Sequence, residues 1–218
     1  MNFPDDTQRL AIVGATGSGK TYAAMWHLSR RSYDRMPWII YDFKGDRLIN
    51  SIPGAYHIRL DQPLPTRPGV YIVHPHPGQT ETGEVESHMW AIWEMENTGV
   101  YIDEGYMVGN NNSAFRAMLT QGRSKRIPMI VLSQRPVWMD RFVFSESEFF
   151  QIFRLQHSDD LKSVQKFIPS DIKKRLPEYN SYYYDVNANK TFHLTPVPDG
   201  DNIISTFDRR LRQLRKVV

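Results

Sequence analysis

The sequence contains no cysteine and no long apolar run, and both absences narrow what this protein can be. Without cysteine among its 218 residues, the chain cannot form disulfides, thiolate metal sites or cysteine nucleophiles. No stretch approaches the roughly 18 apolar residues of a membrane-spanning helix. The first residues lack the basic region and apolar core of a secretory signal. Internal repeats and low-complexity tracts are also absent, so the sequence is compatible with an intracellular globular protein.

A strong excess of one charge is missing as well. The formal net charge is +3, which permits a nucleic-acid partner without requiring one. The hydrophobic share of 40% and the charged share of 23% are ordinary for a globular protein. A chain of this length can form one domain with a large core.

The most informative segment that is present is Gly14-Ala15-Thr16-Gly17-Ser18-Gly19-Lys20-Thr21. It follows an apolar run at 10–13 and precedes a helical pattern, which is the context of a phosphate-binding loop. Its glycines let backbone N–H groups curl around an anion, and the helix N-terminus adds partial positive charge. We expect all eight residues to bind ATP, with Lys20 on the β- and γ-phosphates and the Thr21 hydroxyl on Mg²⁺.

The hydrophobic pattern predicts alternating strands and helices. We expect strands at 10–13, 38–41, 70–74, 99–102, 129–132 and 149–155, a short one near 56–59, and a hairpin at 181–186 and 191–194. Helices are predicted at 21–31, 84–97, 114–121 and 158–167, the last capped by Ser158. This predicts an α/β fold with a mostly parallel central sheet flanked by helices. Residues 1–196 are expected to form one domain built around the phosphate loop and residues 197–218 a basic tail, helical from Asp208.

Polar residues follow four of these strands, at 14–21, 42–46, 103–104 and 133–135. Because ligands bind at the carboxyl ends of parallel strands, these segments should converge on one edge. Asp103 is expected to join Thr21 on Mg²⁺, and Glu104 to polarise the attacking water. Gln134 is the candidate for sensing the γ-phosphate. Asp42 could order the water or Lys20, or be a loop acid without a chemical role.

Cationic residues are candidates for two further roles. Arg123, and after it Arg126, could serve as an arginine finger, in cis or from a neighbouring subunit. For each, a solvated surface charge is the alternative. The basic stretch 209–216 could contact nucleic acid, a membrane surface or an acidic partner, or be a solvated terminal helix.

These segments together resemble the FtsK/HerA superfamily of DNA-pumping P-loop ATPases. The resemblance is strongest to the small genome-packaging ATPases of membrane-containing double-jelly-roll viruses, and it covers roughly residues 8–196. It is carried by the segments 13–21, 39–46, 100–104 and 130–136, with 122–126 and 153–155 also matching. The step Ser133-Gln134-Arg135-Pro136 is the more distinctive mark, because many families share the phosphate loop.

The resemblance implies a P-loop fold of the RecA-like, additional-strand type. It implies a homo-oligomeric ring, most often a hexamer and sometimes a pentamer, with ATP at the subunit interfaces. Glu104 would be the catalytic acid, and an arginine of the next subunit would complete the site. Double-stranded DNA would pass through the ring into a preformed capsid, with 109–112 as a candidate pore loop. Capsid or membrane-vertex proteins would be partners, and the protein would act in the host cytoplasm or at the packaging vertex.

The winged helix, amino-terminal barrel and nuclease domain of larger relatives are not seen, which favours viral packaging over chromosome segregation or repair.

Three alternatives to a DNA motor remain open from the sequence. A nucleotide or small-molecule kinase, a filamentous-phage assembly ATPase and a non-enzymatic nucleotide switch also fit a phosphate loop. Turnover stimulated by DNA would separate the motor from the kinase and the switch.

Overall fold

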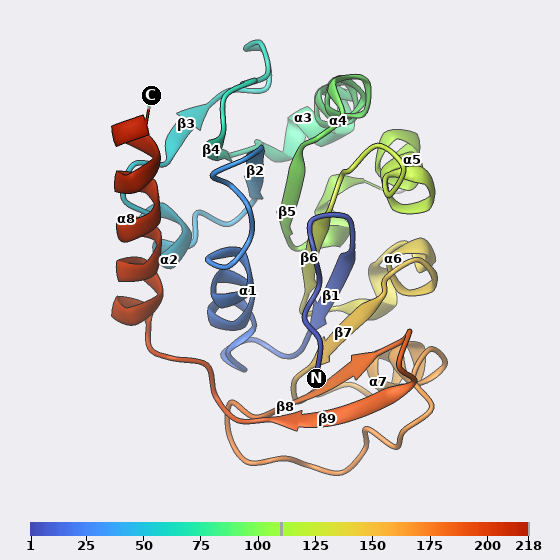
Figure 1. The fold of residues 1–218 in the computed structure, drawn as a ribbon. Coiled ribbons are helices and arrows are strands. Elements are labelled where there is room, and N and C mark those ends of the chain that lie inside the picture. Colours follow the sequence, from blue (N-terminus) through green and yellow to red (C-terminus); the bar gives the residue numbers. More distant parts are fainter. Residues whose placement is uncertain (110, 218) are drawn as a thin grey trace.

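The computed structural model describes residues 1–109 and 111–217, with side chains through residue 215. In the described part, nine strands form one sheet in the order β3-β4-β2-β5-β6-β1-β7-β8-β9, with helices on both faces (Figure 1). The strands are β1 (Arg9–Val13), β2 (Pro37–Asp42), β3 (Tyr56–Ile58), β4 (Gly69–Val73), β5 (Gly99–Asp103), β6 (Met129–Ser133), β7 (Phe149–Ile152), β8 (Ser181–Asp185) and β9 (Lys190–Leu194).

The helices fill the connections between these strands. They are α1 (Lys20–Leu28), α2 (Arg47–Asn50), α3 (Pro77–Glu81), α4 (Glu84–Met95), α5 (Ser113–Gln121), α6 (Arg141–Ser145), α7 (Ser158–Gln165) and α8 (Gly200–Val217), with 3₁₀ turns η1 (Gly105–Val108) and η2 (Pro136–Trp138). Within the described ranges, none of these helices has both the length and the apolar character that a bilayer crossing demands.

The sheet is parallel from β3 to β7, and β8 pairs antiparallel with β7 and with β9. Strand β6 lies between β1 and β5, so an additional strand separates the phosphate-loop strand from the strand that ends in Asp103. The mostly parallel sheet, the additional strand and the terminal hairpin confirm the predicted fold class. Because the strands from β3 to β7 are parallel, their carboxyl ends share one edge of the sheet.

The two faces of the sheet carry separate hydrophobic clusters. In β1, Ala11 and Val13 belong to one cluster, and Leu10 and Ile12 belong to the other. Helices α4 to α7 cover the first face, and α1 and α8 cover the second. Continuous apolar strands are therefore buried on both sides, which fixes the sheet edge as the place for polar chemistry.

Several predicted boundaries were wrong in detail. Helix α1 ends at Leu28, before the predicted residue 31, and β7 ends at Ile152. Helix α7 has His157 at its N-cap, without a side-chain cap hydrogen bond, so Ser158 is the first helical residue rather than the cap. Helix α3, which was not predicted, lies between β4 and α4 and has His76 as its N-cap.

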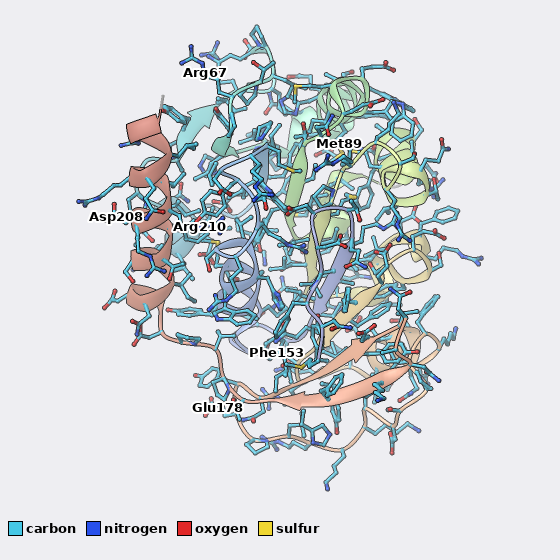
Figure 2. All side chains as sticks on the ribbon, in the orientation of Figure 1. Arg67, Met89, Phe153, Glu178, Asp208 and Arg210 are labelled. Carbon is cyan, nitrogen blue, oxygen red and sulfur yellow. The ribbon has the colours of Figure 1, made fainter. Side chains whose placement is uncertain are left out.

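Helix α8 begins before Asp208 and packs against the body of the protein. Its side chains Ile203, Phe207 and Leu211 are buried in the cluster that contains α1. Arg210 points from α8 toward the body (Figure 2), where it donates to the Ser29 carbonyl at 2.7 Å and pairs with Asp34 at 2.8 Å. Part of the predicted basic surface is therefore used inside the chain. The division into a domain of 1–196 and a tail stays a prediction.

Candidate active site

The phosphate loop connects β1 to α1 and is held against two neighbouring strands. Gly17 and Gly19 have φ values of 72° and 98°, the left-handed region that favours glycine. A Cβ atom on Gly14 would come within 2.5 Å of the Phe153 Cβ atom, so this position needs glycine for close packing. The Gly14 N–H donates to the Ser133 carbonyl at 3.2 Å, and the Ala15 N–H to the Arg154 carbonyl at 2.8 Å. The loop is thereby fixed to the ends of β6 and β7.

Two side chains of the loop have the properties of phosphate ligands. Lys20 is 7% exposed, and its Nζ donates to the Ala15 carbonyl at 3.0 Å. Burial lowers the pKa of Lys20, and the nearby Glu104 carboxylate opposes that shift. Ser18 Oγ is buried and has no hydrogen-bond partner within the described parts of the chain. A bound triphosphate would satisfy this hydroxyl and would keep the Lys20 ammonium charged.

Asp103 ends β5 directly beside this loop. It is 3% exposed, and its pKa is raised to about 7, chiefly by burial. The Lys44 ammonium lowers this pKa, whereas the Glu104 carboxylate raises it. The Asp103 carboxylate and the half-buried Thr21 hydroxyl are oxygen donors of the kind that Mg²⁺ prefers, so these residues fit that ion.

Glu104 is the most constrained side chain of the site. It is fully buried, and its backbone has φ 73° and ψ 78°, an unfavourable conformation for a residue with a Cβ atom. Its Oε2 accepts from the Gln134 N–H at 3.0 Å, and its Oε1 accepts from Lys44 Nζ. A buried, strained carboxylate with two fixed partners is typical of a functional position.

Gln134 connects Glu104 to the phosphate loop. Its backbone N–H binds the Glu104 carboxylate, and its side-chain Oε1 accepts a hydrogen bond from the Thr16 hydroxyl. Three residues predicted from separate segments therefore touch one another. A shift of Gln134 toward or away from the loop would therefore change its hydrogen bond to Glu104.

Lys44 is a functional residue that the sequence analysis did not assign. It lies in the turn after β2, and the side chain of Asp42 accepts hydrogen bonds from the backbone N–H groups of Lys44 and Asp46, at 3.3 and 3.0 Å. The Asn50 side chain donates to the same carboxylate at 2.9 Å. Asp42 thus orders the turn that presents Lys44 to Glu104. A lysine beside an acidic turn was visible in the sequence, but its partner is 60 residues away.

The two predicted arginine fingers lie far from this site within one chain. Arg123 and Arg126 are exposed and precede β6, which runs parallel to β1, so they lie at the sheet edge opposite the phosphate loop. This position favours action on a neighbouring subunit over action in cis, and the role of either residue as an arginine finger stays a prediction. Arg154 is the arginine next to the loop in this chain, through its carbonyl bond to Ala15.

The predicted pore loop is described only in part. Asn110 lies outside the described residues. Asn112 is 5% exposed and caps α5, accepting from the Phe115 N–H at 2.8 Å and donating to the Val108 carbonyl at 3.0 Å. Helix capping therefore uses the Asn112 side chain, and the assignment of 109–112 as a pore loop stays a prediction.

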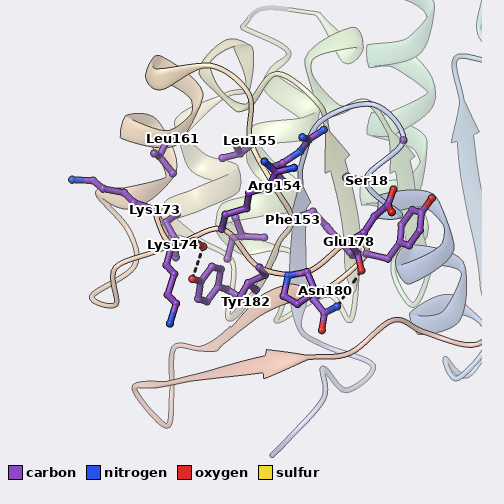
Figure 3. Close-up of a pocket in the computed structure, with 17 residues that line it drawn as sticks. Ser18, Phe153, Arg154, Leu155, Leu161, Lys173, Lys174, Glu178, Asn180 and Tyr182 are labelled. Atoms are coloured by element: carbon purple, nitrogen blue, oxygen red, sulfur yellow. Dashed lines mark hydrogen bonds between the residues drawn. The ribbon is translucent and has the colours of Figure 1, made fainter.

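Two of the cavities that border the phosphate loop have Tyr179 in their lining. The larger one, of about 770 Å³, runs from the loop and Gln134 to Tyr179 and the connection 195–199. The second, of about 430 Å³, lies on the other side of Tyr179 and contains Arg154, Lys173 and Lys174 (Figure 3). The larger cavity has the size of a nucleotide site.

The comparisons with known proteins agree with this geometry. The chain is 49% identical to the DNA packaging ATPase P9 of Enterobacteria phage PRD1 over 218 residues, which is 95% of each chain. No protein-family model matches the sequence.

Solved structures share the fold at low sequence identity. The genome packaging NTPase B204 of Sulfolobus turreted icosahedral virus 2, in complex with AMPPCP, superposes with a TM-score of 0.68 at 18% identity, covering 89% of this chain and all of that one. EssC ATPases 2 and 3 of Geobacillus thermodenitrificans give a TM-score of 0.62 at 13% identity, covering 97% of this chain and 44% of that one.

Proposed function

This chain belongs to the DNA packaging ATPase family represented by P9 of phage PRD1, and we propose that it hydrolyses ATP to drive double-stranded DNA into a viral capsid. The observation that carries the proposal is the position of Glu104. It is buried beside the phosphate loop, and it is tied to both Lys44 and Gln134. A kinase that moves phosphate to a small acceptor has little use for such a carboxylate, whereas hydrolysis needs a group that aligns water.

Each residue around the loop has a separate role in hydrolysis. The loop N–H groups and Lys20 hold the triphosphate, and Thr21 and Asp103 hold Mg²⁺. When bound, this ion neutralises charge on the phosphate oxygens. Glu104 orients the water for attack on the γ-phosphate. Gln134 sits between Glu104 and Thr16, so it transmits loss of the γ-phosphate to the end of β6.

The site needs an arginine from a second copy of the chain. Because Arg123 and Arg126 lie at the sheet edge opposite their own phosphate loop, either would act on a neighbour's nucleotide. A ring of subunits, with six favoured and five possible, provides such an arrangement at every interface. The arginine would stabilise charge in the transition state, an effect of about 10³–10⁵ in rate. Such a ring would act at the packaging vertex of the capsid.

ATP hydrolysis by the purified chain tests this proposal, measured with and without double-stranded DNA over a range of protein concentrations. We expect turnover per chain to rise with DNA and with concentration, because active sites form between subunits. The released product should be inorganic phosphate. Turnover that is independent of concentration and DNA would contradict the motor, and a phosphorylated small molecule as the product would identify a kinase.

A further inference from the structure

The larger cavity continues past the phosphate loop into a region that hydrolysis does not use. Beyond Lys20 and Thr21 its lining includes Tyr22, Phe153 and Tyr179 together with the connection 195–199. This connection, Thr195-Pro196-Val197-Pro198-Asp199, joins β9 to α8 and passes beside the carboxyl edge of the sheet (Figure 1). The cavity is therefore polar at the loop and mostly apolar at its far end.

Tyr179 dominates this far end. Its ring lies over the phosphate loop, since a Cβ atom on Gly19 would be 3.4 Å from Tyr179 Cδ1 and 3.6 Å from Phe153 Cε1. Tyr179 is nonetheless 49% exposed, and its backbone has φ 59°, a strained value for a tyrosine. An exposed aromatic ring, held by strained backbone over a binding loop, indicates a ligand contact rather than core packing.

Hydrogen bonds on both sides of Tyr179 hold this segment in place. The Tyr182 hydroxyl donates to the Lys174 carbonyl at 2.8 Å, and the Asn180 side chain donates to the Glu178 carbonyl at 3.0 Å (Figure 3). The segment 174–180 is thus fastened to β8 at one end. The backbone that carries Tyr179 is held before any ligand arrives, which lowers the entropic cost of binding.

The opposite side of the cavity has a second fixed wall. Tyr22 follows Thr21 on α1, and its ring contacts the start of α8, since a Cβ atom on Gly200 would be 3.5 Å from Tyr22 Cε1. Pro196 and Pro198 stiffen the connection that precedes this contact. A flat ring entering between Tyr179 and this connection would find apolar surface on both of its faces.

Some polar side chains at this end already have partners within the chain. The buried amide of Gln151 is used at both ends, toward His27 Nε2 at 2.9 Å and toward the Ser181 hydroxyl at 2.9 Å. The Asp199 carboxylate accepts from the Asn202 N–H at 2.9 Å, at the start of α8. Tyr22 and Thr195, which carry hydroxyl groups, also line the cavity. Stacking is the contact that every nucleobase can make there, whatever its hydrogen-bonding groups.

We infer that the wall formed by Tyr179 and residues 195–199 is the nucleobase subsite of the triphosphate site, and that it accepts any base of a nucleoside triphosphate with little discrimination. This inference rests on the proposed function, because it places the triphosphate of the same ligand on the phosphate loop. Stacking of one base on an aromatic side chain is worth about 1–3 kcal/mol. Tyr179 should therefore contribute to affinity for the nucleoside part alone.

The test compares binding of ATP and of ribose 5′-triphosphate, which lacks only the base, to three forms of the protein. Tyr179→Asn removes the ring and tolerates positive φ, and Tyr179→Phe keeps the ring as the matched control. We expect the Kd for ATP to rise about tenfold in Tyr179→Asn and to stay near the unaltered value in Tyr179→Phe. The Kd for ribose 5′-triphosphate should be unchanged in both. In the unaltered protein, ATP should bind about tenfold more tightly than ribose 5′-triphosphate.

Base choice gives a second measurement that needs no variant. ATP, GTP and CTP should be hydrolysed with kcat/KM values within about tenfold of one another. A site that discriminates bases only by small differences in contact area changes kcat/KM by little more than that factor. The inference is overturned if Tyr179→Asn binds ATP normally, if it weakens both ligands equally, or if one nucleotide is preferred by more than about a hundredfold. A Lys20→Ala control separates the nucleobase inference from the proposed function. Normal binding of both ligands in that variant would contradict the assignment of the phosphate site itself.

Discussion

At the scale of single residues, Glu104 determines whether the site hydrolyses ATP. We expect Glu104→Gln to lower kcat by about 10²–10⁴, because the amide cannot orient and activate water as a carboxylate does. ATP binding should stay within about threefold of normal, since Lys20 and the loop N–H groups remain. Single-turnover hydrolysis and nucleotide titration measure the two effects separately. Near-normal turnover in Glu104→Gln would contradict the role of the Glu104 carboxylate in activating water.

Lys44 acts on the reaction through Glu104. Removal of its ammonium in Lys44→Ala leaves the buried Glu104 carboxylate with the Gln134 N–H as its remaining described partner, so the carboxylate loses its fixed orientation. We expect kcat to fall about tenfold with little change in KM. Lys44→Arg should retain most of the activity because it keeps the charge. Equal losses of kcat in Lys44→Ala and in the exposed-site control Lys162→Ala would show that Lys44 has no specific part.

The sequence predicted most of the site residues, because each lies at the end of an apolar strand. It identified Thr16, Asp103, Glu104 and Gln134 as neighbours before the sheet order was known. The Lys44–Glu104 pair could not be predicted, because it depends on β2 and β5 being adjacent. Separation in sequence hides such pairs unless the strand order is fixed.

At the scale of secondary-structure elements, the long apolar strands were predicted and the shortest helices were not. Helices α2 and α6 have 4 and 5 residues, too few to show a helical period. Their N-caps, Asp46 and Asp140, are the signals that could have revealed them. Helix α8 was placed too late because its first turns are polar on their exposed side, while Ile203 and Phe207 pack inward.

Helix α1 is joined to the sheet through a buried histidine that makes stability depend on pH. His27 Nε2 lies 2.9 Å from the Gln151 Oε1 atom, and burial lowers the pKa of His27 from 6.5 to about 3. The unfolded chain therefore binds a proton between pH 6.5 and about 3 that the folded protein excludes. Stability from this group is complete above pH 6.5 and falls as the pH drops through that window, by roughly 5 kcal/mol in total.

The measurement is the unfolding free energy from pH 7 to pH 4 for the unaltered protein, His27→Gln and the exposed-site control His157→Gln. We expect the acid-side loss of stability to be shallower in His27→Gln, because the buried titrating group is gone. The control should follow the unaltered protein. Parallel curves for all three proteins would mean that His27 is not the source of acid sensitivity.

At the scale of the whole molecule, the proposed motor requires that each subunit supply an arginine to the nucleotide site of its neighbour. Arg123→Ala/Arg126→Ala and Glu104→Gln should each be inactive alone. Mixed in equal amounts, they should regain activity, because the intact site of an arginine variant can meet the intact arginine of a Glu104→Gln neighbour. In a randomly mixed ring this occurs at about a quarter of the interfaces, half of the sites multiplied by half of the neighbours.

The mixing result discriminates between trans and solvent-exposed roles for these arginines. A mixture with no more activity than the sum of its components would contradict a finger supplied in trans. Full activity of the double arginine variant alone would mean that both side chains are only solvated surface charges. Ring size measured on the same samples supplies the number of interfaces over which the activity is shared.

The most direct test of the central claim is ATP-driven movement along DNA, measured as displacement of a triplex-forming strand from a linear duplex. If ATP hydrolysis drives movement along the duplex, we expect displacement of the third strand by the unaltered protein with ATP. We expect none with Glu104→Gln, and none by the unaltered protein without nucleotide. Rapid ATP hydrolysis in the presence of the duplex with no displacement of the third strand would contradict it.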